Sequence, residues 1–163
     1  MSVDGNLIKR EGFHLNHRTP VAGYQGTDAI IFLGINPSTG TFPDWKVETY
    51  YDALKEYGFG EAHLTDCFKL RHKSWKALTQ DSLLIKEARD DLMEEIKIIQ
   101  PRLIVLVGKQ YFDFCQGFLD GVNIELFPIS HYSFRYGTKE TLTEKIRSEI
   151  RRVKDNFVGR NGD

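Results

Sequence analysis

Two short, uninterrupted apolar runs, AIIFL at 29–33 and LIVLV at 103–107, most constrain how this chain folds. A continuous apolar run, as opposed to an alternating one, is typical of a strand buried on both faces of a parallel sheet. Each run is far shorter than the roughly 20 apolar residues that a membrane-spanning helix needs. The two runs therefore predict central strands of an α/β sheet.

Patterns with helical spacing separate the predicted strands. Alternation of strands and helices implies a parallel sheet with helices on both faces. We therefore expect an α/β fold, a three-layer α/β/α sandwich around a mostly parallel four-stranded sheet. The strands are predicted at 29–34, 63–68, 103–107 and 123–127, and the helices at 44–57 (capped by Asp44), from about Ser82 to Pro101, from Gly108 through Phe118 and from about Lys139.

Length and composition favour one globular domain. The 163 residues are 40% hydrophobic and 28% charged, and they contain no internal repeat, low-complexity tract or linker. We expect a single domain over 1–163, with the polar segment 1–26 packed on it as an N-terminal extension. The first ten residues lack the apolar stretch of a secretory signal, so a cytoplasmic protein without a membrane partner is expected. We also expect a monomer.

The sequence gives no sign of a metal or an organic cofactor. The two cysteines, Cys67 and Cys115, lie in apolar stretches, and they are too few for an iron–sulfur cluster, which usually takes four thiolates. Buried, reduced thiols are expected. His14 and His17 lie three residues apart without other ligands nearby, which favours surface residues over a metal site.

Polar residues follow the first predicted strand in the sequence 34–38, GINPS. Ligands of parallel sheets bind beyond the carboxyl ends of the strands. A glycine permits close backbone approach, and Pro37 restricts the backbone of Asn36. An amide held in this way can orient a water molecule. The alternative is an ordinary turn, in which Asn-Pro is common.

The loop at 128–137, PISHYSFRYG, follows the last predicted strand. His131 can donate a hydrogen bond to an oxygen that gains negative charge. Arg135 can pair with a phosphate. The alternative is a surface loop with a hydrogen-bonded histidine. The aromatic residues of this loop, which can stack on or wedge between bases, are Tyr132, Phe134 and Tyr136.

A basic cluster follows the second predicted strand. Basic side chains with an interleaved aromatic residue can neutralise phosphates and stack on bases. A solvated surface loop is the alternative. The net charge of −1 gives no global basic field, and the basic residues of the last helix alternate with acids, as on a solvated helix face. The cluster comprises Lys69, Arg71, His72, Lys73, Trp75 and Lys76.

These segments together resemble the uracil-DNA glycosylase superfamily. The sequence 34–38 is similar to its first active-site motif, closest to the G-I-N-P form of the mismatch-specific branch. The sequence 131–133, HYS, is similar to the second motif, H-P-S, which precedes a loop that enters the DNA minor groove. The segment 64–69 resembles the strand that ends in a base-selecting asparagine, and 103–109 resembles the third strand with the start of its helix. The resemblance covers about residues 29 to 153.

The resemblance implies a DNA glycosylase of base excision repair that hydrolyses the N-glycosidic bond of a deaminated or mismatched base, uracil or a related one. Asn36 would position the attacking water, and His131 would stabilise charge on the departing base. Phe42 would stack on the flipped base, with Trp45 and Tyr51 as alternatives. The further residues expected to bind the base or DNA are Gly34, Ile35, Pro37, Ser38, Asp66, Lys69, Arg71, Lys73, Ser133 and Arg135.

Two residues depart from the family pattern. Asp66 stands where the base-selecting asparagine is expected, and an ionised carboxylate only accepts hydrogen bonds, so it favours a base that presents donors. Asp66 can instead be protonated or lie outside the pocket. Tyr132 replaces the proline of the second motif.

Two other functions remain open. The chain can be a superfamily member that binds nucleic acid or a nucleobase without hydrolysis. It can also be an unrelated nucleotide-binding or hydrolase domain. Against the latter, the sequence contains no G-x-G-x-x-G, G-K-[ST] or G-x-S-x-G motif.

Overall fold

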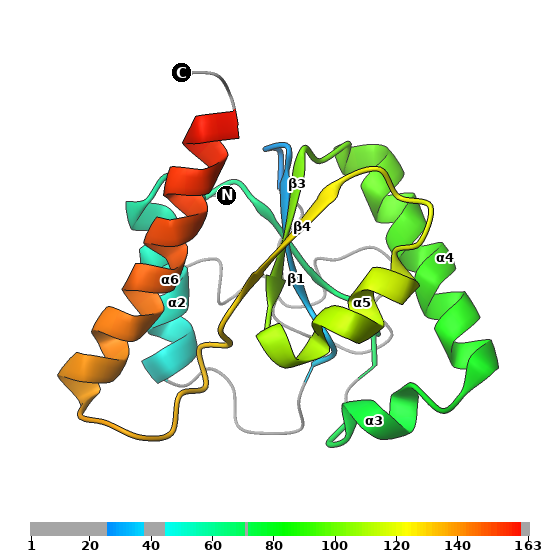
Figure 1. Cartoon of the computed structure of the whole chain (residues 1–163), viewed down its shortest axis with the longest axis horizontal. Coiled ribbons are helices and arrows are strands. Elements are labelled where there is room, and N and C mark those ends of the chain that lie inside the picture. The colour runs from blue at the N-terminus through cyan, green and yellow to red at the C-terminus, as the bar shows by residue number, and fades with distance from the viewer. Residues whose placement is uncertain (1–25, 38–44, 71, 161–163) are drawn as a thin grey trace.

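The computed structural model describes residues 26–37, 45–70 and 72–160, and Figure 1 shows their arrangement. Several sequence predictions fall outside these residues. They concern the extension before residue 26, His14, His17, Ser38, Phe42, Asp44 and Arg71.

The centre of the fold is a four-stranded, all-parallel sheet with the strand order β2-β1-β3-β4. Because every strand runs in the same direction, all four carboxyl ends lie along one edge, the lower edge in Figure 1, which we call the carboxyl edge. The α/β class predicted from the sequence is confirmed. The strands are β1 (Ile30–Gly34), β2 (His63–Asp66), β3 (Leu103–Val107) and β4 (Glu125–Ile129).

Helices cover both faces of the sheet, as Figure 1 shows. Alternate residues of β1 face opposite layers: Ile30 and Phe32 belong to one buried cluster, and Ile31 and Leu33 belong to the other. Burial on both faces explains why the strands are continuously apolar. The first layer contains α2 (Trp45–Glu56) and α6 (Lys139–Arg160), and the second contains α4 (Ser82–Ile99) and α5 (Phe112–Phe118).

The strand order also marks where a ligand is expected. From β1 the chain moves to β2 on one side, and it then crosses back to β3 on the other side of β1. The connections therefore reverse direction between β1 and β3, and parallel sheets bind ligands at the carboxyl end of such a switch point. The sequence that begins with Ile35 leaves β1 at this point.

The last strand begins and ends two residues later than predicted. The sequence pattern placed it at 123–127, whereas β4 spans Glu125–Ile129 and includes Pro128. A proline lacks the N–H that a central strand needs. It is accepted here because β4 is an edge strand of the described sheet and pairs with β3, with Pro128 opposite Leu106.

One short helix, α3 (Trp75–Leu78), was not predicted. The sequence pattern predicts a basic loop for this stretch. Its signal was Ser74, whose hydroxyl caps the helix by accepting a hydrogen bond from the Ala77 N–H at 3.3 Å. Four residues are too few for a recognisable apolar period.

Cys67 and Cys115 are free and buried, as predicted, with their sulfur atoms 3.8 Å apart. Burial raises the pKa of the Cys67 thiol, and the neighbouring Cys115 raises it further. Within the described part of the chain, no group of three or more His, Cys, Asp or Glu side chains could hold a metal ion. None of the described helices is long and apolar enough to cross a bilayer.

Truncation of a central strand residue tests the packing. Leu106 of β3 is fully buried. Leu106→Ala should lower the free energy of unfolding by about 3 kcal/mol, because it removes apolar contacts and leaves a cavity. Leu83→Ala is the control, since Leu83 is 66% exposed on α4, and its effect should stay within about 0.5 kcal/mol. Equal losses in urea unfolding of the two variants would contradict this packing.

Candidate functional site at the carboxyl edge

The loops that leave β1 and β2 are joined by backbone hydrogen bonds beyond the ends of the strands. These bonds extend the pairing of the two strands to the rim, so the two loops are held together. They run from Cys67 N–H to Gly34 O at 2.9 Å, from Phe68 N–H to Ile35 O at 2.9 Å and from His72 N–H to Pro37 O at 3.1 Å.

The side chain of Asn36 is oriented by this joined pair of loops. Its Nδ2 donates to Pro37 O and to His72 O, each at 2.8 Å, so both amide hydrogens are used. A flipped amide would point its oxygen at two carbonyl oxygens, so this orientation is favoured. Among the described residues Oδ1 has no hydrogen-bond donor, and the half-buried side chain presents it as an acceptor.

Asp66, the last residue of β2, lies against the end of β1. A Cβ added to Gly34 would lie 2.5 Å from Asp66 Oδ1, so the glycine leaves the room that this carboxylate occupies. Burial, the Tyr132 phenol and then the Asp66 carboxylate raise the pKa of Tyr51. Asp66 therefore lies against the first motif, and its charge acts on Tyr51 of α2.

His131 has a defined neutral tautomer. Its Nδ1 accepts a hydrogen bond from the Ser133 N–H at 3.1 Å and lies 2.8 Å from Ser133 Oγ. Because Nδ1 is an acceptor, the proton of the neutral ring is on Nε2. Nε2–H is thus a donor, and Ser133 orients the ring.

Tyr132 anchors the β4–α6 loop on α2. Its ring stacks on Tyr50 with centroids 4.8 Å apart, and the His131 ring packs against it at 4.1 Å. Lys46 of α2 donates to Phe134 O in the same loop. The tyrosine that replaces the motif's proline is therefore a packing residue, and it holds His131 near α2.

Lys69 is buried and does not belong to the exposed basic cluster that the sequence predicts. The sequence placed it in an exposed basic cluster that contacts phosphates, but its side chain is buried, with the residue only 3% exposed. Its Nζ lies 2.6 Å from Glu95 Oε2 and donates to Thr65 Oγ1 at 3.0 Å and to Asp66 O. The ammonium is paired with these groups inside the protein and does not reach the surface.

Glu95, on α4, is 0% exposed and was not identified from the sequence. His63 Nδ1 accepts from the Gly26 N–H at 3.3 Å, so its Nε2–H donates to Glu95 Oε1 at 2.8 Å. Burial acts to raise the pKa of Glu95, but the hydrogen bond from His63 and the charge of Lys69 outweigh it and lower that pKa. The available signal was a carboxylate between Leu92 and Ile96 on the apolar face of a predicted helix.

The other predicted residues divide between the rim and the core. Pro37 is half-buried beside Asn36, and Ile35 is buried. Of the candidate stacking residues, Tyr51 is buried and Trp45 is half-buried, with Lys46 and Lys139 over its ring. The exposed residues of the carboxyl edge include Lys73, Lys76, Ser133, Arg135, Tyr136 and Lys139.

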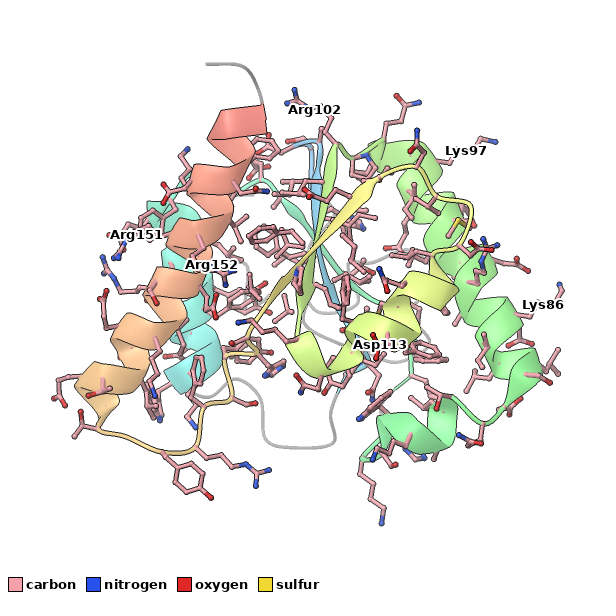
Figure 2. All side chains as sticks on the ribbon, viewed as in Figure 1. Lys86, Lys97, Arg102, Asp113, Arg151 and Arg152 are labelled. Atoms are coloured by element: carbon pink, nitrogen blue, oxygen red, sulfur yellow. The ribbon has the colours of Figure 1, made fainter. Side chains whose placement is uncertain are left out.

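Several basic residues elsewhere on the molecule are paired with acids or lie away from this edge. Figure 2 shows Arg151 on the outer side of α6 and Arg102 at the opposite edge of the sheet. The guanidinium of Arg152 lies over the ring of Phe127 in β4, 5.4 Å from its centroid. Arg151 bonds Glu144 at 3.2 Å, and Arg152 pairs with Glu149. The exposed side of the last helix is a solvated, ion-paired face, as the sequence predicts.

Comparison with known proteins adds no assignment. No protein-family model matches the chain, and no curated protein matches it significantly.

The tautomer of His131 can be measured. In ¹⁵N NMR spectra at a pH where the ring is neutral, we expect Nδ1 to show the shift of an unprotonated nitrogen and Nε2 that of a protonated one. Ser133→Ala keeps the backbone N–H and should keep this tautomer. Ser133→Pro removes the donor and should produce a tautomer mixture. A proton on Nδ1 in the unmodified protein would refute the assignment.

The Glu95 pair gives a defined pH dependence. The folded-state pKa of Glu95 is lowered, so its stabilisation is present above the unfolded pKa and is lost as pH falls through the folded value. Glu95→Gln should cost about 3 kcal/mol at neutral pH, because Lys69 keeps a buried charge without its partner. The deficit should shrink as the pH falls below the ordinary glutamate value of 4.5. Glu94→Gln, exposed on the same helix, should show little deficit at any pH, and a pH-independent Glu95→Gln deficit would contradict the account.

Proposed function

We propose that this protein is a DNA glycosylase that hydrolyses the N-glycosidic bond of a deaminated or mismatched base, as the resemblance to uracil-DNA glycosylases implies. The single observation that carries the proposal is the Asn36 amide. Both of its hydrogens are held by backbone carbonyls, and its oxygen is presented as an acceptor at the carboxyl edge. The loop that carries His131 leaves the same edge.

The first role in the proposed reaction belongs to Asn36. The target nucleotide leaves the base stack at a cost of a few kcal/mol and enters the site from the rim. Asn36 Oδ1 accepts a hydrogen bond from a water molecule and aims the water oxygen at the sugar carbon. That carbon gains a bond to the water oxygen and loses its bond to the base nitrogen, and the surplus proton of the water passes to solvent. Orientation of this kind lowers the barrier without a change in the charge of the amide.

The second role belongs to His131. As the glycosidic bond breaks, its electron pair goes to the base, and negative charge spreads to the base oxygens. The Nε2–H of the neutral ring is a preorganised donor for such an oxygen. The ring is held from both sides, by the Ser133 N–H and by the Tyr132 ring, so little reorganisation is needed when the charge develops.

The rim of the site supports a DNA partner. Lys73, Lys76 and Arg135 are exposed there, and such residues can neutralise phosphates. Of the aromatic residues in the β4–α6 loop, Tyr132 and Phe134 pack against the core, whereas Tyr136 is 85% exposed. Tyr136 is therefore the residue of this loop that is available to stack on or wedge between bases.

A binding function without hydrolysis is the second candidate. The observation that favours it is the Asp66 carboxylate beside the first motif, because an ionised carboxylate repels the carbonyl oxygen of uracil. Within the glycosylase proposal, the same carboxylate favours a base that presents N–H donors. The two candidates make different predictions for the same DNA panel.

Duplexes that contain uracil, hypoxanthine, xanthine or a mismatched thymine separate these candidates. We expect strand scission after alkali treatment for at least one base, and a loss of about 100-fold or more in Asn36→Ala. Asn123→Ala, an exposed asparagine before β4, is the matched control and should retain the full rate. Thermal unfolding of both variants reports their folding. Binding without scission by the unmodified protein supports the second candidate. If the unmodified protein shows no binding and no scission at low salt, both candidates are refuted.

A further inference from the structure

The buried ion pair of Lys69 and Glu95 has no part in the proposed chemistry, yet it contacts a residue of the candidate site. Two ionised groups this deeply buried are costly, and an apolar pair of similar volume often gives equal or greater stability. The pair touches a candidate site residue through the main chain of Asp66, whose carbonyl accepts from Lys69. The arrangement therefore indicates that the ion pair serves to hold the main chain of the candidate site in place.

We propose that Lys69 and Glu95 are positioning residues: their ion pair ties the exit of β2 to α4, and it thereby holds Asn36 and Asp66 in place. For catalysis this inference rests on the proposed function, whereas for the geometry of the site it stands alone.

The first link runs through the ammonium of Lys69. It forms an ion pair with Glu95 on α4, and it donates hydrogen bonds to the Thr65 hydroxyl and to the Asp66 carbonyl. Glu95 Oε1 also accepts a hydrogen bond from His63 in β2, and its Oε2 faces Lys69, so both carboxylate oxygens have a partner from β2 or its exit. The main chain of Asp66 is thus fixed relative to a helix of the second layer.

The second link runs from this segment to Asn36. Cys67 and Phe68, which follow β2, lie along the exit of β1 and donate their N–H groups to Gly34 O and Ile35 O. His72 then donates its N–H to Pro37 O and accepts from Asn36 Nδ2. If the segment shifts, the carbonyl that orients the Asn36 amide shifts with it.

The test removes both charges together, so that neither remains buried alone. Lys69→Met/Glu95→Gln keeps the side-chain volumes, and the new amide oxygen on α4 can still accept from His63. The matched control is Arg147→Met/Glu56→Gln, which removes an exposed pair of 2.6 Å between α6 and α2 on the other face of the sheet.

The first readout is amide hydrogen exchange, which needs no activity. In the Lys69/Glu95 double variant, exchange at the Cys67, Phe68 and His72 amides should accelerate about tenfold or more, because their loop opens locally. Exchange at Val105 in β3 should not change, and the control variant should match the unmodified protein at all four amides. Unchanged exchange at the three loop amides in a folded double variant overturns the proposal.

The second readout is single-turnover base release on the best substrate. The rate constant should fall about tenfold or more while DNA affinity changes less than about twofold, since misplacement of the water-orienting group affects the chemical step. Faster exchange with an unchanged rate constant overturns the catalytic part. If the unmodified protein releases no base, the proposed function fails, and the exchange result still decides whether the pair positions the loops.

A milder variant covers the case in which the double variant does not fold. Thr65→Val removes one partner of the ammonium and keeps the shape of the side chain. It should accelerate exchange at the same three amides by about threefold, in line with a modest local loss of stability. No acceleration there overturns the proposal.

Discussion

The hydrogen bonds that join the exits of β1 and β2 are the constraint on which the candidate site depends. Adjacent parallel strands end at one edge, but their loops ordinarily diverge. Here the backbone pairing continues through Cys67 and Phe68, and His72 closes it with bonds to Pro37 and to the Asn36 amide. An exposed asparagine in a free turn would sample many orientations. The joined loops hold both amide hydrogens of this one and leave its oxygen as an acceptor, and that is the property a water-orienting group needs.

The second half of the candidate site comes from a distant part of the chain and is held by a different force. Aromatic stacking of Tyr132 on Tyr50 and the bond from Lys46 to Phe134 O attach the β4–α6 loop to α2. Asp66 lies against Gly34 in the first half, and its carboxylate contributes to the raised pKa of Tyr51 on α2. An acceptor from one loop and a donor from another thus belong to loops that leave the same edge, as the proposed reaction requires.

The sequence predicted the sheet because continuous apolar strands have few alternatives, and it predicted the edge because ligand sites in parallel sheets follow the strand ends. Other features depended on three-dimensional context. Pro128 lies within β4 because that strand is at an edge, and strand order cannot be read from a local pattern. Lys69 resembled its exposed neighbours in the sequence, and only the distant Glu95 explains its burial. The family resemblance itself stays a prediction.

The central claim is that Asn36 and His131 face the same extruded base. The most direct measurement is a titration followed by NMR of the Asn36 side-chain amide and the His131 ring. The ligand is a duplex whose target nucleotide carries a fluorine at sugar C2′, which resists cleavage because it destabilises the cation-like sugar. The account predicts that both signals shift together at the same DNA concentration. A shift of only one signal, or of neither while the DNA binds, would contradict it.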